Sequence, residues 1–303
     1  MGYGAEIGEI PMVDENAPPE ARLCPEGPEE LYLTLLKKCL TRYLFHDQWR
    51  PVQPHPSRKQ LVVLYAWLQK LLASQNLVLM RPQPFDEEFA LNGGPWKARY
   101  SSAETMIGLH RLGQLQNSIV DVIRNQVPGD LIEAGAWRGG ATIFMRAVLK
   151  AYRDTTRSVW VADSFSGLPP RDAASFPQDA GFPVERQQHM VVSLDEVKRN
   201  FARYDLLDDR VRFLAGWFRD TLPTAPIKRL ALIRLDGVLY ESTMEALKYL
   251  YPKLSSGGYV IIDDYYTPHC TAAVDDFRRD HHITEPLQVA TWPRWAVYWQ
   301  CRS

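Results

Sequence analysis

The feature that most constrains the fold is a regular alternation of short apolar runs and amphipathic stretches from residue 129 onward. The apolar runs predict strands at 129–135, 157–164, 211–216, 230–236 and 258–263. The amphipathic stretches predict helices at 139–152, 193–205, 240–254 and 271–281. This βαβ rhythm is typical of a parallel sheet that is covered by helices on both faces.

Two further apolar runs near the end of the chain, 287–292 and 295–301, predict a closing hairpin that adds an antiparallel edge to the sheet. The predicted fold class is therefore α/β. We expect a Rossmann-like sandwich with a mostly parallel seven-stranded sheet, an antiparallel C-terminal edge and an N-terminal helical extension.

The chain divides into three predicted units, which are 1–27, 28–100 and 101–303. The first is acidic and carries prolines, which indicates a flexible tail. The second has apolar residues at helical spacing and ends in an aperiodic stretch. Such a stretch is typical either of a lid or substrate wall or of a plain surface linker. The third unit opens with a long amphipathic helix, expected over 103–126.

The composition is that of an ordinary water-soluble protein, with 303 residues, 46% hydrophobic residues and a net charge of −1. Near-neutral charge gives no support for binding to nucleic acid or to a membrane surface. No apolar run approaches the ~18 residues of a membrane span. The four cysteines are scattered, so we expect reduced thiols in a cytoplasmic protein.

The first two predicted strands end in residues that suit a nucleoside ligand. Glu133 and the glycines that follow it form a loop between a strand and a helix, although not with GxGxxG spacing. The carboxylate would repel a phosphate and suits a cation. Asp163, which ends the next strand, can accept hydrogen bonds from ribose hydroxyls. Together they indicate S-adenosylmethionine (SAM), with a structural turn and a helix-capping Asp as the alternatives.

Three carboxylates end the next two predicted strands, namely Asp236, Asp263 and Asp264. If these strands are neighbours, the three groups converge, and they cannot all stay ionised in a dry cleft without a cation. A hard divalent ion with oxygen ligands resolves this repulsion, and Mg²⁺ is the default. In the alternative interpretation the Asp pair caps the following helix and Asp236 pairs with Arg234 or another base.

Several strings resemble the macrocin O-methyltransferase (TylF-type) family, notably "EAGAWRGG", "VWVADSFSGLPP" and "LYEST". The resemblance extends over roughly 100–300. It implies a SAM-dependent methyltransferase fold and a SAM- and Mg²⁺-dependent enzyme that methylates sugar hydroxyls on macrolides and related natural products. By family resemblance we also expect a small-molecule acceptor and a homo-oligomer.

The resemblance implies a role for particular residues by position. The implied donor-binding residues are Thr105, Met106, Glu133, Ala134, Gly135, Trp137, Arg138, Asp163, Ser164, Phe165, Gly216 and Trp217. The implied metal ligands are Asp236, Asp263 and Asp264. Two positions depart from the family pattern, which usually has an acidic residue at Val238 and a neutral one or His at Glu104.

The expected mechanism is metal-assisted deprotonation of the acceptor hydroxyl, followed by in-line methyl transfer. Asp236 is the first choice for the base and His269 the second. Other readings stay open. The acceptor could be a catechol-like phenol or another non-sugar hydroxyl, the enzyme could be an N-methyltransferase, or the chain could be an inactive scaffold of the same fold.

Overall fold

The computed structural model describes residues 27–52, 59–94, 102–170, 172, 174–183, 190–290 and 296–302. The expected flexible tail falls outside the described residues except for Gly27, and so does the end of the aperiodic stretch, from 95 to 101.

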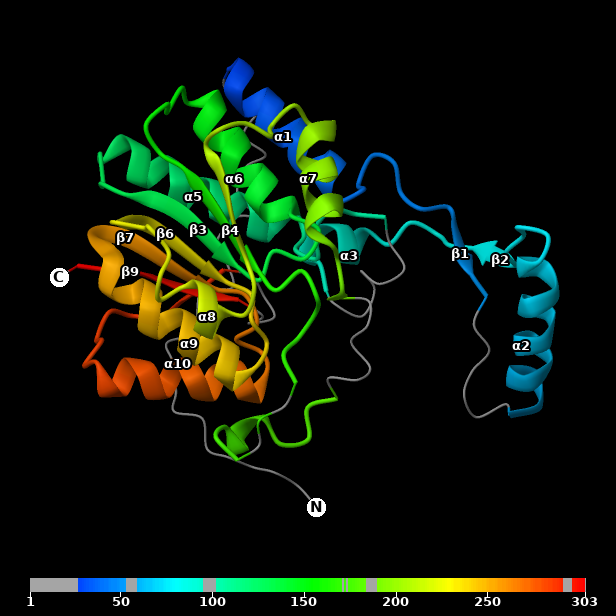
Figure 1. Ribbon diagram of the computed structural model, residues 1–303. Helices are drawn as coiled ribbons and strands as arrows, with labels where there is room; N and C mark the ends of the chain where they lie inside the picture. The colour runs from blue at the N-terminus through cyan, green and yellow to red at the C-terminus, as the bar shows by residue number, and fades with distance from the viewer. Residues whose placement is uncertain are drawn as a thin grey trace, which may run out of the picture.

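A seven-stranded sheet forms the centre of the molecule (Figure 1). Its strands, in spatial order, are β5 (Val211–Ala215), β4 (Val159–Asp163), β3 (Asp130–Ala134), β6 (Leu230–Leu235), β7 (Leu254–Ile262), β9 (Val297–Gln300) and β8 (Gln288–Val289). The first five are parallel, whereas β9 is antiparallel to both β7 and β8. The predicted fold class, including its antiparallel C-terminal edge, is confirmed.

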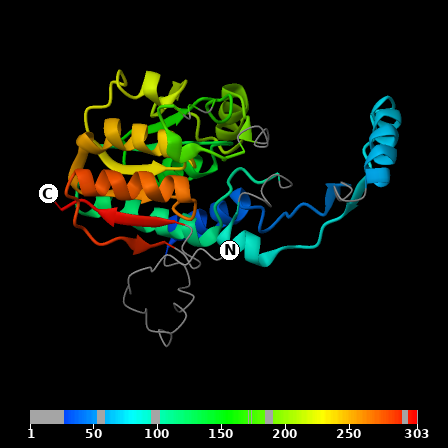
Figure 2. The same cartoon turned by 90° about the horizontal axis from the view of Figure 1, so that it is seen from below.

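Helices cover both faces of this sheet (Figures 1 and 2). One face carries α5 (Leu109–Arg124) and α6 (Gly140–Ala151), with α1 (Pro28–Leu40) packed against α6. The other face carries α9 (Tyr240–Leu250) and α10 (Pro268–Asp280), which pack on each other. The helix α7 (Leu194–Arg203) lies between β4 and β5 in the chain, and the short α8 (Phe218–Thr221) follows β5.

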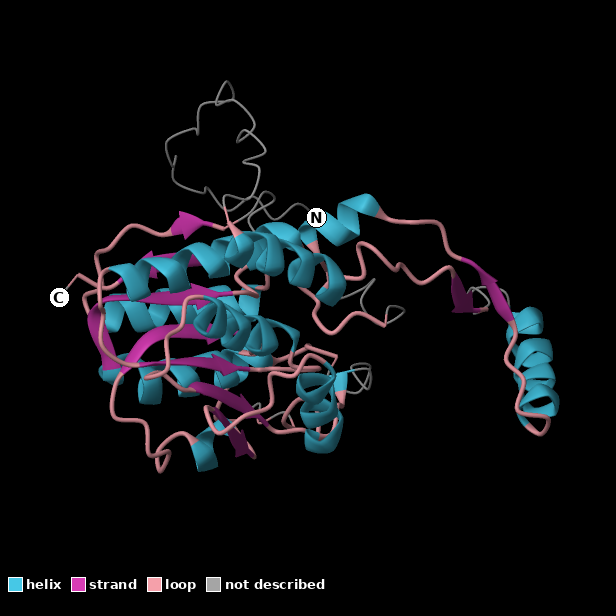
Figure 3. Ribbon diagram, turned by 90° about the horizontal axis from the view of Figure 1, so that it is seen from above, coloured by secondary structure: helices cyan, strands magenta, loops and turns pink. Residues whose placement is uncertain are grey.

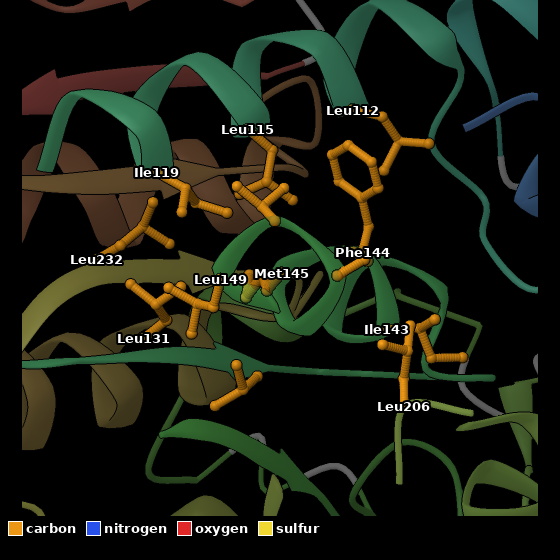
Figure 4. Packing of buried hydrophobic residues seen from close by; sticks show 14 of the residues in the cluster. Leu112, Leu115, Ile119, Leu131, Ile143, Phe144, Met145, Leu149, Leu206 and Leu232 are labelled. Carbon is orange, nitrogen blue, oxygen red and sulfur yellow. The ribbon is translucent and has the colours of Figure 1, made fainter. Parts of the chain in front are cut away.

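Each face of the sheet buries its own apolar core. Leu131 of β3 packs in a cluster with Leu115 of α5 and Phe144 of α6, as Figure 4 shows. The next residue, Ile132, points the other way and joins the cluster that contains Leu247 of α9. Because neighbouring strand residues point to opposite faces, a strand buried on both faces becomes a continuous apolar run. This is why these strands are visible in the sequence.

The order of the strands reverses between β3 and β6. From β3 the chain proceeds outward through β4 and β5, and it then returns to place β6 on the other side of β3. In an open parallel sheet, such a reversal leaves a crevice beyond the carboxyl ends of the two central strands. The loop that follows β3 and the loop that follows β6 therefore open into the same crevice.

The helix α2 (Lys59–Ala73) stands apart from this body (Figure 3). It lies at the end of a ribbon of two antiparallel strands, β1 (Trp49–Pro51) and β2 (Met80–Pro82). Its exposed apolar side chains are Leu61, Val62, Val63, Leu64, Trp67 and Leu71. The short helix α3 (Glu87–Asn92) then brings the chain back to α5. Within the described ranges, none of the helices combines the length and the apolar character that crossing a bilayer requires.

The predicted helix over 103–126 is wrong at its start, because α5 begins only at Leu109. The backbone before it bonds to other parts of the molecule. The Glu104 N–H donates to the Leu40 carbonyl, and the Glu104 carbonyl accepts from Gly140. Tertiary hydrogen bonds thus replace the first helical turns.

Two other helix boundaries differ from those predicted. The helix α9 ends at Leu250 rather than at 254, because Pro252 cannot continue an α-helix. The helix α10 begins at Pro268 rather than at 271, since the Thr267 side chain accepts from the Cys270 N–H and caps it. His269 therefore lies in a first helical turn. The short elements β1, β2, α3 and α8 were not predicted.

Candidate active site

The glycine loop after β3 packs directly against the end of β6. Gly135 has a φ of 95°, a conformation that favours glycine. A Cβ at this position would lie 2.0 Å from the Asp236 backbone oxygen. The loop can therefore pass this close to Asp236 only because residue 135 has no side chain.

Asp163, at the end of β4, holds the shape of the same loop. Its Oδ2 accepts from the N–H groups of Ala136 and Trp137 at 2.8 and 3.1 Å, and its Oδ1 accepts from Phe165 at 2.7 Å. Burial raises the pKa of Asp163 while these three donors lower it. Since a carboxylate oxygen has two lone pairs, Oδ1 keeps one for a further donor such as a ribose hydroxyl.

These loops line one pocket at the carboxyl edge of the sheet. Most of the predicted donor-binding residues are in its wall: Thr105, Met106, Glu133, Gly135, Trp137, Asp163, Ser164, Gly216 and Trp217. The predicted metal ligands Asp236, Asp263 and Asp264 line the same pocket. The fold thus brings residues from five separate strand ends and from the segment before α5 into one place.

Three predicted donor-binding residues and one predicted base are not in the pocket wall. Ala134 is buried within β3. Arg138 donates to the Ala103 carbonyl at 2.8 Å, and Phe165 packs on Phe213. His269 Nδ1 lies 2.7 Å from the Gln178 carbonyl oxygen, and its ring stands edge-on to Phe182.

The three aspartates form a compact cluster. Oxygen atoms from Asp236, Asp263 and Asp264 all lie within 4.8 Å of one another. The Asp263 and Asp264 residues are buried, and the Asp236 side chain is 28% exposed. Burial, together with repulsion from neighbouring carboxylates, raises the pKa of Asp236 and of Asp264.

Two buried arginines hold this cluster in place. Arg234 pairs with Glu133, with Asp236 at 3.0 Å and with Asp263 at 2.8 Å. Arg111 of α5 reaches the second oxygen of Asp263 at 2.6 Å. The alternative to a metal site predicted that Asp236 pairs with Arg234. That pairing is confirmed.

The cluster contains more carboxyls than arginines. If Glu133, Asp236, Asp263 and Asp264 were all ionised, four negative charges would face the two positive charges of the arginines and leave a formal charge of −2. The raised pKa values of Asp236 and Asp264 mean that protons hold part of this charge when no cation is bound. Burial also raises the pKa of Glu133 to about 8, although Arg234 lowers it. Carboxylate oxygens are preferred ligands of hard cations, so the donor set and its charge fit a divalent ion such as Mg²⁺.

The helix-capping part of the alternative interpretation is wrong, because Thr267 caps α10. Asp264 instead accepts from the Val238 N–H at 3.0 Å. Val238 has a φ of 47°, so the loop after β6 turns sharply at the position where the sequence resemblance led us to expect an acidic residue. The backbone of this loop, rather than the side chain of Val238, therefore contacts the Asp264 carboxyl group of the candidate metal site.

The pocket also fits a cationic nucleoside donor. Glu133 lines it, and among the described residues its buried Oε2 has no hydrogen-bond partner. An ammonium group beside Glu133 would donate a hydrogen bond to this oxygen, and a sulfonium group nearby would be attracted to its negative charge. Nine of the twelve predicted donor-binding residues therefore line the pocket, and their chemistry fits SAM.

Sequence reasoning missed Arg111 as part of this site. It lies in the first turn of α5, close to the apolar residues Leu112 and Leu115 that form the core face of the helix. A charged residue on an apolar helix face was the available signal, because burial of a charge requires a partner. Nothing in the sequence identifies Asp263 as that partner, since the two residues are far apart in the chain.

Comparison with solved structures places this architecture among known enzymes. The structure of the O-methyltransferase NovP matches with a TM-score of 0.75 and 42% sequence identity, over 91% of this chain and 100% of that chain. The protein is accordingly an O-methyltransferase with a Rossmann-like fold. It belongs to the macrocin-O-methyltransferase (TylF) family, whose model matches residues 29–301.

Two curated relatives are also similar over most of their length. A demethyldecarbamoylnovobiocin O-methyltransferase of Streptomyces niveus is 50% identical over 222 residues, which are 73% of this chain and 83% of the relative. An 8-demethyl-8-(2,3-dimethoxy-alpha-L-rhamnosyl)-tetracenomycin-C 4'-O-methyltransferase of Streptomyces olivaceus is 46% identical over 263 residues, which are 86% and 90% of the two chains. The family predicted from the sequence is confirmed.

The contact between Gly135 and Asp236 gives a first prediction. Gly135→Ala should lower the free energy of unfolding by about 2 kcal/mol or more, because a Cβ would strain the loop and meet the Asp236 oxygen. It should also abolish binding of S-adenosylhomocysteine (SAH), measured by calorimetry. Gly113→Ala is the matched control. It lies within α5 with open space around it, so it should raise stability by roughly 0.5–1 kcal/mol. Unchanged SAH binding in Gly135→Ala would contradict the proposed loop.

Proposed function

We propose that the protein transfers a methyl group from SAM to a sugar hydroxyl of a glycosylated natural product, with a divalent cation held by Asp236, Asp263 and Asp264. The observation that carries this proposal is the acidic cluster, in which oxygens of three aspartates lie within 4.8 Å of one another and which shares one pocket with the glycine loop.

Each partner would supply one part of the chemistry. When bound, SAM supplies a methyl group on a cationic sulfur, and Mg²⁺ lowers the pKa of an acceptor hydroxyl. The chain would hold the donor through the glycine loop, with Asp163 at the ribose and Glu133 at the cationic end. Gly216 and Trp217 would form the adenine side of the pocket.

Asp236 is the best candidate for the group that accepts the proton. Its side chain is 28% exposed, whereas that of Asp263 is 6% exposed, so an acceptor hydroxyl can reach Asp236. Arg234 holds one of its oxygens and fixes its orientation. His269 is less suitable, because its Nδ1 is directed to the Gln178 carbonyl and the residue is not in the pocket wall.

The sugar acceptor is inferred from a relative. The Streptomyces olivaceus enzyme is named for methylation of a compound that carries a rhamnosyl group. The pocket wall of this protein also contains the apolar residues Leu168, Pro169, Phe182, Pro183 and Met190. Such residues suit the apolar aglycone of a glycosylated acceptor.

The metal site can be tested by chelation and by substitution. EDTA should abolish methyl transfer from labelled SAM to a deoxysugar-bearing acceptor, and Mg²⁺ should restore it. Asp264→Asn should lower turnover by about 100-fold, since it removes a charged ligand but keeps an oxygen for the Val238 N–H. Both changes should leave SAH binding intact, as measured by calorimetry.

Asp208→Asn provides the matched control, because Asp208 is paired with Arg146 and lies outside the pocket wall. Its turnover should stay close to that of the unmodified protein. Full activity in metal-free enzyme would remove the cation from the proposal. Methylation of catechols with no methylation of any glycoside would remove the sugar acceptor.

We also propose that residues 28–100 form an extension through which two copies of the chain associate. A 15-residue helix with apolar side chains in water is marginal alone, so α2 needs a covering surface. The family model includes this segment, which makes it part of the enzyme rather than an added module. A second copy of the same enzyme is therefore the occupant that we propose.

Light scattering during gel filtration tests this association. The unmodified protein should elute with twice the mass of one chain, and Val63→Glu/Trp67→Glu should elute as a monomer. These two side chains are 70% and 62% exposed and lie one turn apart on α2. Leu207→Glu is the control, since Leu207 is 42% exposed on the body. A monomeric unmodified protein at the same concentration would contradict the proposal.

A further inference from the structure

The segment Ser102–Met106, here called the donor segment, connects the N-terminal extension to the proposed donor site. Thr105 and Met106 at its end line the pocket. Its backbone is not helical, so each of its polar groups needs a partner elsewhere. The partners come from two regions that are far apart in the chain.

The first region is the turn after α1. The Glu104 N–H donates to the Leu40 carbonyl at 3.1 Å. The N–H and hydroxyl of Ser102 donate to the two oxygens of Asp47 at 2.7 and 2.6 Å. Arg42 Nε donates to the Ser102 carbonyl at 3.3 Å. The N-terminal extension thus holds the beginning of the donor segment.

The second region is the glycine loop itself. Arg138 donates to the Ala103 carbonyl at 2.8 Å, and the Gly140 N–H donates to the Glu104 carbonyl at 2.9 Å. The Arg138 guanidinium also lies over the Trp137 ring, 4.2 Å from its centroid. Trp137 lines the pocket, so these contacts connect the donor segment to the wall of the proposed donor site.

Glu104 lies where these two sets of contacts meet. It is 4% exposed, and its Oε1 accepts from Arg42 at 3.1 Å. Burial raises the pKa of Glu104, and Arg42 and Tyr204 oppose this effect. A buried carboxylate is costly unless it is paired, so the position of Glu104 depends on its ion pair with Arg42.

We propose that Glu104 is a positioning residue, and that its ion pair with Arg42 fixes the donor segment so that the N-terminal extension sets the affinity for the methyl donor. The inference rests on the proposed function, because it takes the pocket as the donor site. Loss of the ion pair frees the donor segment, so Thr105 and Met106 must be ordered again each time the donor binds. The acidic cluster is not involved, and turnover at saturating donor should change little.

A double-mutant cycle on SAH affinity tests this proposal. Glu104→Gln keeps the size of the side chain, and Arg42→Met removes the other partner, which is 30% exposed. Each change should weaken SAH binding roughly 5-fold by calorimetry and raise the KM for SAM by a similar factor. The double variant should bind no more weakly than Arg42→Met alone, because Arg42→Met already removes the ion pair together with the hydrogen bond to the Ser102 carbonyl. Arg42→Lys should restore most of the affinity.

Arg146→Met is the matched control, since it breaks a partly buried ion pair with Asp208 outside the pocket wall. It should lower the melting temperature without changing SAH affinity. Additive losses in the cycle, or equal losses in Arg146→Met, would overturn the inference. If the unmodified protein does not bind SAH, the proposed function fails as well. If it binds SAH and Glu104→Gln binds equally well, only the positioning role fails.

Discussion

The site depends on the pairing of Arg234 with three carboxyls that the strand order brings to one edge of the sheet. Placing β6 between β3 and β7 brings Glu133, Asp236 and Asp263 to one edge of the sheet. Arg234, on the central strand of the three, contacts all of them and is itself fully buried. Removing one partner of such a network is costly, because it leaves a buried charge without compensation. The arrangement therefore fixes three strand ends relative to one another. It also gathers carboxyl oxygens of Asp236, Asp263 and Asp264 that a cation could bind.

The donor side of the pocket depends on backbone geometry rather than on charge. Gly135 lets the loop after β3 touch Asp236, and Asp163 holds that loop through backbone N–H groups. The loop is thus in contact with the acidic cluster at one end. At its other end, Arg138 and Gly140 contact the donor segment. The glycine loop thus connects the proposed donor site to the proposed cation site, so it would help to set the distance between methyl donor and acceptor oxygen.

The sequence was most informative where one physical requirement dominates. Strands buried on both faces must be apolar throughout, so β3 and β6 were found within a residue or two. The acidic cluster was predicted because the carboxyl ends of neighbouring parallel strands meet at one edge of the sheet, where polar residues follow each apolar run. Prediction failed where tertiary contacts override local preference. The residues before Leu109 have helical spacing but bond to Leu40 and Gly140, and Arg111 reaches a carboxylate that no local pattern reveals.

We propose that the acidic cluster holds a divalent cation beside the methyl donor. Anomalous diffraction from a crystal grown with Mn²⁺ and SAH can test this. One Mn²⁺ peak is expected within bonding distance of Asp236, Asp263 and Asp264, with SAH against the glycine loop. A crystal with SAH in the pocket and no Mn²⁺ peak at these carboxylates would contradict it.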